Sequence, residues 1–402
     1  MTDSKASSVP DVGGLREDSK FNRRETEGGS QTQMAAIDKN LRGIVKNAVR
    51  GQDLRKEEIQ FLLRLEDDES LDVVFRTARE LRTKHFGNTV FLYGFLYAST
   101  YCRNDCHFCF YRRSNADSLR YRRDEDEIAS AARQLAASGV HLIDLTLGED
   151  PEFFRTDDAG ISRLEHLVRR VSQETGLPVM ISPGVVPGES LGKLSEAGAN
   201  WYACYQETHN RELFRRLRPD QDYDERWAIK SRASDFGLLV EDGILCGVRE
   251  TTGDVADAIL GMRQLEIAQM RAMTFVPQRG TPMASRPAPS TSRELLCIAV
   301  MRLACPDRLI PASLDVEGLT GLTPRLNAGA NVVTSIVPPG HGLAGVAQSS
   351  FDISDSRRTT ASVVAELESL DLEPATIDEY RDWVAHRRRE LGAPPLQERR
   401  LC

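Results

Sequence analysis

The sequence predicts an α/β fold, a (βα)8 TIM-type barrel with N-terminal helices and a C-terminal helical extension. Between residues 89 and 338, eight short apolar runs alternate with helix-like segments. The runs are almost continuously apolar, as expected of parallel strands that are buried on both faces. A chain of 402 residues is long enough for one closed barrel with additional helices at both ends.

The expected strands and helices follow one another in order along the chain. Strands are expected at 90–99, 141–147, 178–183, 200–208, 239–248, 270–277, 310–317 and 331–338. Helices are expected near 125–138, 161–174, 188–197, 223–236, 255–268, 292–304 and 319–327. Apolar residues in the helices recur at three- and four-residue spacing, which gives each helix one face to pack on the strands.

The segments outside this alternation differ in composition. Residues 1–33 are rich in Ser, Gly, Asp, Arg and Gln and are predicted to form a disordered tail. Residues 34–88 show helical spacing, so we expect N-terminal helices that pack on the barrel and close its bottom. The barrel is expected over 89–350, and a helical extension with a tail over 351–402.

Composition and charge narrow the class of protein. Hydrophobic residues make up 40% of the chain, which is enough for a large core. The net charge of -8 argues against nucleic acid as a partner. We expect no membrane association and a cytoplasmic location, because no apolar run resembles a membrane span or a secretion signal. Three of the eight cysteines form one motif and the others are scattered, as in proteins of a reducing compartment.

The cysteine motif follows the first expected strand. Cys102, Cys106 and Cys109 lie within eight residues, with the spacing Cys-x3-Cys-x2-Cys. One loop with this spacing can bind three of the four irons of a cubane cluster and leave the fourth open to an exogenous ligand. The alternative is a zinc site completed by His107 or by a distant histidine. Zinc sites usually combine two Cys-x2-Cys pairs, and this sequence contains one, so the cluster is favoured.

Polar residues within the apolar strands indicate a ligand site inside the barrel. Asp144 and Arg271 lie in the second and sixth strands, and Ser313 and Asp315 share one face of the seventh. Unpaired charges in a dry barrel are costly, so each needs a partner or a ligand. One cation and two anions would form a cage for one carboxylate and two ammonium groups, which favours a diamino acid. Alternatively, these charges pair with one another as a structural network.

The loops after the strands contain further candidates. Gly148, Glu149 and Asp150 follow the second strand, where glycine permits a close backbone approach and the acids can receive an ammonium group. Taken alone, this Gly-Glu-Asp-Pro stretch is also an ordinary turn. Glu207 ends the fourth strand and Arg226 follows in the next helix. Taken alone, these two residues are also typical of a surface ion pair.

Together these motifs resemble a known group of enzymes. The cysteine spacing, with an aromatic residue before the third cysteine, resembles the signature of the radical S-adenosylmethionine (SAM) enzymes. Over residues 34–346 the chain is similar to the methylornithine synthase family of pyrrolysine biosynthesis. The stretches that carry the similarity are 86–88, 99–102, 143–146, 148–151, 181–185, 205–208, 310–315 and 325–331.

This resemblance implies the cofactors and the site residues. A [4Fe–4S] cluster would be bound by the three cysteines of the motif. The implied SAM-binding residues are Gly148, Glu149, Asp150, Ser182, Glu207, Arg226, Gly247 and Pro277. The implied substrate-binding residues are Asp144, Arg271, Ser313 and Asp315. Gly247 and Pro277 belong to stretches expected beside the adenine, and Arg249 stands where a second glycine is common in the family.

The resemblance also implies a reaction, the rearrangement of lysine to 3-methylornithine by an isomerase of the mutase type. A 5′-deoxyadenosyl radical would abstract a hydrogen atom from lysine, after which the substrate radical fragments and recombines at a neighbouring carbon. The implied partners are a small amino acid substrate, with lysine as the expected one, and a flavodoxin- or ferredoxin-type reductant.

Two other functions remain open. A related radical SAM enzyme of the biotin synthase or hydrogenase maturase branch would act on another amino acid. Sulfur insertion would need a second cluster, for which only Cys204 and Cys246 lie on expected barrel strands. A non-catalytic iron–sulfur or zinc-binding scaffold is the second alternative. The long N-terminal tail, the basic C-terminal extension and the loop with His341 depart from the family, and His341 faces either the barrel mouth or solvent.

Overall fold

The computed structural model describes residues 38–154, 159–338 and 358–392. The expected disordered tail at 1–33 and the loop that contains His341 lie outside the described residues. Contacts divide the chain into two units after Gly43, and the fold below is that of the unit that begins at Ile44.

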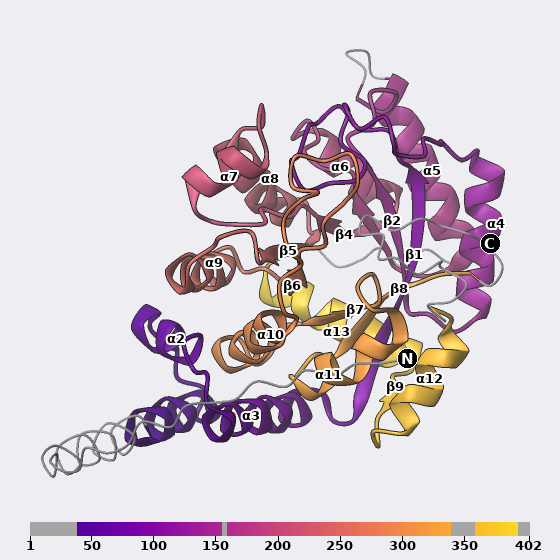
Figure 1. The fold of residues 1–402 in the computed structure, drawn as a ribbon. Helices are drawn as coiled ribbons and strands as arrows, with labels where there is room; N and C mark the ends of the chain where they lie inside the picture. The colour runs from indigo at the N-terminus through magenta and orange to yellow at the C-terminus, as the bar shows by residue number, and fades with distance from the viewer. Residues whose placement is uncertain (1–37, 155–158, 339–357, 393–402) are drawn as a thin grey trace, which may run out of the picture. The chain divides into compact units, whose positions relative to one another are not determined.

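Eight parallel strands form a barrel, as predicted (Figure 1). Neighbouring strands follow the order β6-β5-β4-β3-β2-β1-β8-β7. Their bounds are β1 Thr89–Ser99, β2 Leu142–Leu147, β3 Val179–Ser182, β4 Ala199–Ala203, β5 Leu239–Cys246, β6 Gln269–Thr274, β7 Pro311–Ser313 and β8 Val332–Ile336. A short strand, β9 Glu373–Pro374, pairs with the beginning of β1. The barrel strands are buried along almost their whole length, which agrees with their continuous apolar sequences.

Helices precede β1, connect the barrel strands and follow β8. Their bounds are α2 Lys56–Leu62, α3 Asp68–Phe86, α4 Glu125–Ala137, α5 Ala159–Thr175, α6 Ser190–Ala197, α7 Arg211–Leu217, α8 Tyr223–Asp235, α9 Thr252–Gln264, α10 Ser292–Ala304, α11 Leu322–Asn327, α12 Thr360–Glu368 and α13 Ile377–Glu390. Local sequence sets several starts: Asp124 and Thr251 cap α4 and α9, and each forms a capping box with an acid three residues later. Among the described residues, every helix is too short or too polar to span a lipid bilayer.

Between β6 and β7 the barrel is closed at one end. Met270 N donates to the Leu309 carbonyl at 2.9 Å, and Leu309 N donates to Ala268 at 3.0 Å. Beyond these bonds, β7 pairs with β8. The seventh strand is shorter than the sequence indicated, because the chain turns after Ser313. The strands are therefore held together where they begin, and β6 and β7 separate toward their carboxyl ends.

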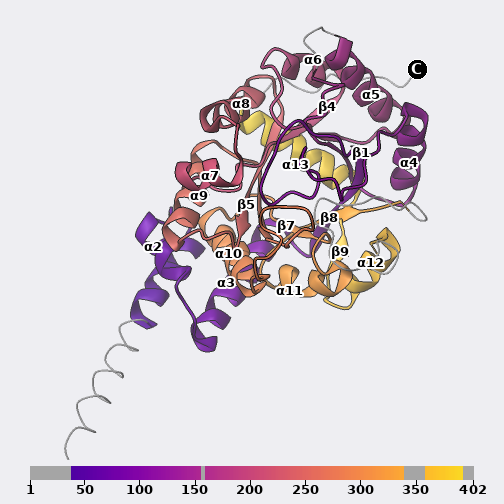
Figure 2. The same cartoon turned by 45° about the horizontal axis from the view of Figure 1, so that its top comes forward.

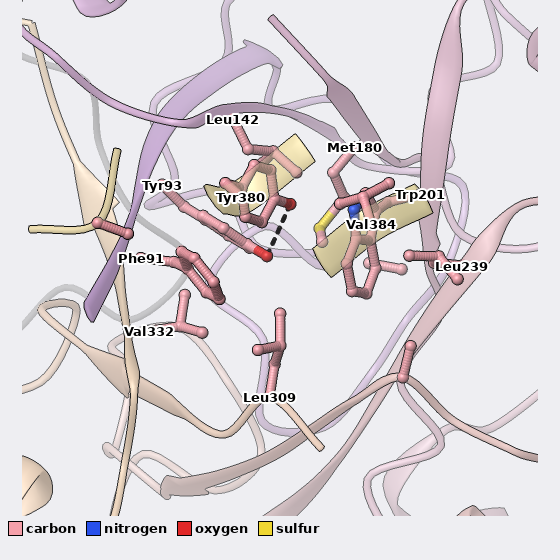
Figure 3. Packing of buried hydrophobic residues seen from close by; sticks show 13 residues of the cluster. Phe91, Tyr93, Leu142, Met180, Trp201, Leu239, Leu309, Val332, Tyr380 and Val384 are labelled. Carbon is pink, nitrogen blue, oxygen red and sulfur yellow. Dashed lines mark hydrogen bonds between the residues drawn. The ribbon is translucent and has the colours of Figure 1, made fainter. Parts of the chain in front are cut away.

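Aromatic side chains fill the end of the barrel where the strands begin (Figure 3). Phe91 and Tyr93 of β1 and Trp201 of β4 pack there with Tyr380 and Val384 of α13. The Tyr380 hydroxyl donates to the Tyr93 hydroxyl at 2.9 Å. In Figure 2, α13 is seen in yellow inside the outline of the barrel, behind its strands. The sequence predicted that the N-terminal helices close this end, but α13 provides most of the closure. Of the N-terminal helices, α3 contributes Phe86 at its end, while α2 packs on α9 and α3 on α10.

Replacing Tyr380 by alanine is expected to lower the free energy of unfolding by about 3–5 kcal/mol, because a buried aromatic side chain is lost and a cavity remains. Urea unfolding followed by circular dichroism would measure the change. The control is Asp382→Ala at an exposed position of the same helix, where we expect less than about 0.5 kcal/mol. Equal losses in the two variants would contradict the role of α13 in the core.

Candidate active site

The three cysteines lie in the loop that follows β1. Cys106 is buried, and its Sγ accepts hydrogen bonds from Gln221 Nε2 at 3.1 Å and from Arg218 Nη1 at 3.4 Å. Cys109 packs beside the buried aromatic residues of the second half of β1. The loop is thus held both by the barrel strand and by the segment that joins α7 to α8.

Burial affects the ionisation of two of these thiols. It raises the pKa of Cys102 to about 11 and raises that of Cys109 further. The thiols of Cys102 and Cys109 therefore keep their protons unless a cation is bound, and iron is such a cation. In the described part of the chain, no group of three or more His, Cys, Asp and Glu side chains could hold a single metal ion. Zinc needs its ligands around one point, whereas the cysteines of a cubane cluster bind separate irons, so the donor set fits a cluster.

A glycine lets the end of β2 contact the cysteine loop. A Cβ atom at Gly148 would lie 2.3 Å from the carbonyl oxygen of Tyr101 and 2.9 Å from Cys102 Cβ. A backbone hydrogen bond holds the contact, since Arg103 N donates to the Glu149 carbonyl at 2.9 Å. The Gly-Glu-Asp-Pro turn is therefore fixed directly against the cysteine loop.

Glu149 and Arg226 form a buried ion pair beside this loop. Arg226 Nη2 lies 3.0 Å from Glu149 Oε1, and Arg103 Nε lies 2.9 Å from Glu149 Oε2. Burial alone would raise the pKa of Glu149, but Arg226, the N–H of Val185 and Arg103 hold it below its ordinary value. Glu149 and Arg226 line a cavity of about 290 Å³. A carboxylate and a guanidinium in one cavity can bind the two charged groups of an amino acid.

Asp150 has a different role from its two neighbours in the turn. It is fully buried, and Arg122 donates to its two oxygens at 2.8 and 2.7 Å. Ser99 at the end of β1 also donates to Oδ2. Asp150 does not line the cavity around Glu149. Its carboxylate is thus occupied in joining the turn to the end of β1.

Glu207 is paired with Arg218 rather than with Arg226. Arg218 Nη2 lies 2.6 Å from Glu207 Oε1, and all three side chains are largely buried rather than at the surface. Glu207 has a positive φ of 66°, and its backbone bonds to Gly243 and Leu245 of β5 at 3.0 Å. Burial raises the pKa of Glu207, although Arg218 opposes this change.

A central cavity of about 130 Å³ joins residues from separate strands. The residues predicted to bind SAM or substrate that line it are Asp144, Ser182, Glu207, Arg271 and Asp315. Its apolar walls include Phe95, Phe108, Tyr205 and Phe275. Phe108 belongs to the cysteine loop, so this cavity adjoins the loop. Val276 and Gln278 line the cavity, whereas Pro277 between them does not.

Gly247 also lies outside the lining of the central cavity. A Cβ atom at Gly247 would lie 2.3 Å from Pro289 Cγ, so this glycine permits the packing of two loops. Arg249 has a positive φ of 82°, a conformation that glycine adopts without strain. The resemblance implies a glycine at this position, and the positive φ explains why glycine would be favoured there.

Asp144 forms no ion pair among the described residues. Its Oδ1 accepts hydrogen bonds from Thr146 Oγ1 at 2.9 Å and from Ser182 Oγ at 3.0 Å. Thr146 stands opposite Ser182 in the register of β2 and β3. Burial raises the pKa of Asp144 to about 7, and the charge of Glu241 adds to this effect. At neutral pH the carboxyl group is therefore a mixture of protonated and charged forms until a cation binds.

Arg271 has a partner that the sequence did not reveal. Its Nε donates to Glu241 Oε1 at 2.6 Å, and its Nη1 donates to Thr334 Oγ1 at 3.1 Å. The guanidinium also lies 5.6 Å from the centre of the Tyr205 ring. Glu241 is fully buried on β5. The guanidinium is thus fixed in position by a carboxylate, a hydroxyl group and an aromatic ring.

Asp315 has a partner from the C-terminal part of the chain. Arg358 Nη2 donates to Asp315 Oδ1 at 2.7 Å, and Arg358 Nε donates to the carbonyl oxygen of Ser335 at 2.9 Å. Ser313 Oγ donates to Asp315 Oδ2 at 3.2 Å, so the two side chains meet. They do not share a strand face as expected, because β7 ends at Ser313 and Asp315 lies in the turn that follows. Ser313 does not line the central cavity and contacts Asp315 instead. Ser335 has a positive φ of 68°, an uncommon conformation for serine.

The charges near the central cavity are more numerous than the sequence indicated. Asp144, Glu207, Arg271 and Asp315 line the cavity, and among the described residues Asp144 forms no ion pair. The partners of the other three lie behind the lining: Arg218 pairs with Glu207, Glu241 with Arg271, and Arg358 with Asp315. Sequence reasoning counted one cation and two anions. Glu241 carried a signal, since it is an acid within an apolar strand. Arg358 carried none, because it lies among other polar residues far from the barrel strands in sequence.

Comparisons with known proteins agree with this geometry. A model of the Radical SAM superfamily matches residues 96–260. The 3-methylornithine synthase of Methanosarcina acetivorans is 42% identical over 332 residues, which cover 83% of this chain and 93% of that protein. The enzyme of Methanosarcina barkeri is 43% identical over 327 residues, or 81% and 92%. A crystal structure of methylornithine synthase has a TM-score of 0.80 at 42% identity and covers 85% of this chain and 99% of that one.

The barrel, the cysteine loop within the matched segment and these similarities define a radical SAM enzyme. Within that superfamily, the chain belongs to the family of the 3-methylornithine synthases.

Proposed function

We propose that this protein converts lysine to 3-methylornithine as a radical SAM mutase that carries a [4Fe–4S] cluster. The observation that carries the proposal is the central cavity, where buried carboxylates and a guanidinium group lie next to the cysteine loop. Further support is the identity of 42% and 43% to two proteins named 3-methylornithine synthase, more than nine-tenths of whose length this chain covers.

The cofactor residues in this proposal surround the cysteine loop. Cys102, Cys106 and Cys109 bind the cluster. Glu149 receives the ammonium group of SAM and Arg226 its carboxylate, which is supported by the ion pair that these residues form in one cavity. Gly148, Ser182 and Glu207 surround the remainder of the cofactor, and Asp150 positions the turn. Gly247 and Pro277, which do not line the central cavity, act indirectly by shaping the loops beside it. When bound, the cluster and SAM supply the electron and the carbon radical that begin the reaction.

The substrate residues in this proposal complement the charge of lysine. Lysine has two ammonium groups and one carboxylate, a net charge of about +1 at neutral pH. The two acid–arginine pairs, Glu241 with Arg271 and Asp315 with Arg358, are neutral together, so Asp144 adds a net charge of -1 once it ionises. Arg271 binds the carboxylate of lysine with the donors that Glu241 leaves available. Asp144 and Asp315 receive the ammonium groups, and Ser313 holds the Asp315 carboxylate in position.

Enclosure is the other contribution of the chain to this reaction. Aromatic side chains surround the central cavity, and α13 closes the opposite end of the barrel. Such walls exclude water and keep the fragments of a divided substrate close enough to recombine. Loss of a fragment would otherwise end the reaction without product.

The direct test is anaerobic incubation of the reconstituted protein with lysine, SAM and dithionite. We expect 3-methylornithine together with methionine and 5′-deoxyadenosine, identified by mass spectrometry against standards. Incubation with ornithine or arginine in place of lysine is the matched control. Cofactor cleavage without any rearranged lysine would disprove the substrate. The absence of SAM cleavage would instead favour the non-catalytic scaffold.

The remaining expectations about partners belong to the same proposal. A flavodoxin- or ferredoxin-type protein supplies the electron in a reducing, cytoplasmic environment. Its support is that the seven cysteines in the described residues are all free thiols, five of them buried. Replacement of dithionite by reduced flavodoxin in the same incubation would test the electron donor.

Lysine affinity is expected to depend on pH through Asp144. Its raised pKa of about 7 means that binding an ammonium group requires loss of a proton below that pH. The KM for lysine should therefore rise about fivefold between pH 7 and pH 6, because the ionised fraction of the carboxyl group falls by about that factor, and this dependence should disappear in Asp144→Asn. A pH profile that is unchanged in Asp144→Asn would contradict the assignment.

The protonation of Asp144 also affects protein stability, and its pH dependence is opposite to that of lysine binding. The folded protein binds the Asp144 proton more tightly than the unfolded chain, because the folded pKa is raised. The resulting stabilisation is present near pH 4 and is lost as the pH rises through about 7. Substrate binding and stability thus favour opposite ends of this pH range.

A further inference from the structure

The segment that joins α7 to α8 contacts a cysteine of the loop and a proposed cofactor residue at the same time. Arg218, the residue after α7, donates to Cys106 Sγ at 3.4 Å and to Glu207 Oε1 at 2.6 Å. It is 8% exposed, and its guanidinium lies 5.3 Å from the centre of the Phe108 ring. One side chain therefore connects the sulfur of a proposed cluster ligand to the carboxylate of Glu207.

A second connection runs from the same sulfur to Arg226. Gln221 Nε2 donates to Cys106 Sγ at 3.1 Å, while its Oε1 accepts a hydrogen bond from Arg226 Nη2 at 2.9 Å. Arg226 is also the partner of Glu149. Both groups of proposed SAM contacts, the Glu149–Arg226 pair and Glu207, are thus linked to Cys106 through one intervening side chain each.

Hydrogen bonds to the sulfur ligands of an iron–sulfur cluster affect its reduction potential. Reduction adds one electron and therefore one negative charge, which a donor on the sulfur stabilises. Removal of a donor, and still more of a positive charge, makes reduction less favourable. Cys106 receives both kinds of donor, a guanidinium and an amide.

We propose that Arg218 and Gln221 are positioning residues that couple SAM binding to the reduction potential of the cluster through Cys106. A cofactor that engages Glu207 and Arg226 changes the partners of Arg218 and Gln221, and thereby the hydrogen bonds on the sulfur. Thermodynamic linkage makes the coupling reciprocal. The factor by which SAM binding changes the reduction equilibrium equals the factor by which reduction of the cluster changes the affinity for SAM. The proposal rests on the cluster and SAM assignments and does not require lysine to be the substrate.

The test is a redox titration of the reconstituted protein with dithionite, with the reduced cluster followed by electron paramagnetic resonance, with and without SAM. In Arg218→Met and Gln221→Leu we expect reduction to become about tenfold less favourable, which for a one-electron couple is about 59 mV toward negative potential. The change in potential on adding SAM should shrink in both variants. Arg218→Lys keeps the positive charge but cannot donate to two partners with the geometry of a guanidinium group. Its potential should therefore lie between those of the parent and Arg218→Met.

Arg215→Met is the matched control, because Arg215 is an exposed arginine on the last turn of α7. Its potential and its response to SAM should equal those of the parent. If Arg218→Met loses iron, Gln221→Leu decides alone, because it keeps the Arg218–Glu207 pair. Parental potentials in a Gln221→Leu protein with full iron content would overturn the proposal. The absence of a cluster signal in the parent would overturn both this proposal and the proposed function, whereas failure to convert lysine would affect the proposed function alone.

Discussion

Replacement of Cys102, Cys106 or Cys109 by alanine is expected to abolish SAM cleavage. Each cysteine supplies one ligand of the proposed cluster, and the spacing leaves no substitute ligand within the loop. The measurements are iron content, the absorption spectrum of the cluster and 5′-deoxyadenosine released in the presence of dithionite. The parent should contain about four irons per chain, as one [4Fe–4S] cluster requires.

Cys305→Ala is the matched control for these variants. Cys305 is also a buried thiol, but it follows α10, outside the cysteine loop. Its loss should leave the iron content and SAM cleavage unchanged. A Cys106→Ala protein that still cleaves SAM, or a parent with iron well above four per chain, would disprove the single-cluster assignment.

Asp144→Asn and Arg271→Lys are expected to uncouple SAM cleavage from product formation. Each change removes a charge-assisted contact with lysine worth about 1.5–3 kcal/mol, so lysine should bind about ten- to a hundredfold more weakly. Arg271→Lys keeps the positive charge but loses the planar guanidinium group. That group donates hydrogen bonds to Glu241 and Thr334 and, in the proposal, to the carboxylate of lysine. The decisive quantity is 3-methylornithine formed per 5′-deoxyadenosine released.

The control for this prediction is Asp257→Asn on the surface of α9, where the carboxylate is half-exposed and pairs with Lys56. It also removes one negative charge, but far from the barrel interior, and should leave the product ratio at the parental value. A parental ratio in Asp144→Asn and Arg271→Lys would mean that these charges are structural. That outcome would contradict the proposal that the substrate is a diamino acid.

Asp315 requires a more careful experiment, because its partner Arg358 is also buried. In Asp315→Asn the guanidinium of Arg358 would lose its charged partner, so a loss of activity alone would not identify a substrate contact. A cycle of Asp315→Asn, Arg358→Met and the double variant separates the two roles. If Asp315 binds an ammonium group, the double variant regains stability while its KM for lysine stays high.

The sequence alone was sufficient for features that are encoded locally. Alternation of apolar runs and amphipathic segments predicted the eight strands, because a strand that is buried on both faces consists almost entirely of apolar residues. The cysteine spacing predicted the loop, since its three thiols are neighbours along the chain. Asp144 and Arg271 were found because a charge within an apolar strand is conspicuous, and both indeed line one cavity.

Only the tertiary structure decided which of these residues are partnered. Arg358 lies 43 residues from Asp315 in sequence, and Gln221 lies 115 residues from Cys106, yet each pair is joined by a hydrogen bond. Neither distance leaves a pattern in the sequence, because an ion pair or hydrogen bond depends on position in space and not on spacing along the chain. Asp150 shows the converse: it belongs to the Gly-Glu-Asp-Pro motif, but Arg122 and Ser99 occupy its carboxylate.

The bottom of the barrel depended on the tertiary structure for the same reason. Helical periodicity identified both the N-terminal helices and α13, and either could have supplied an apolar face. What decided between them is the fit of Tyr380 and Val384 among the aromatic side chains at the start of β1 and β4. Complementary packing of this kind involves residues that are almost 300 positions apart, as the bond between Tyr93 and Tyr380 at a separation of 287 shows. The sequence thus determined which elements form and which residues are polar, while packing in three dimensions determined which of them meet.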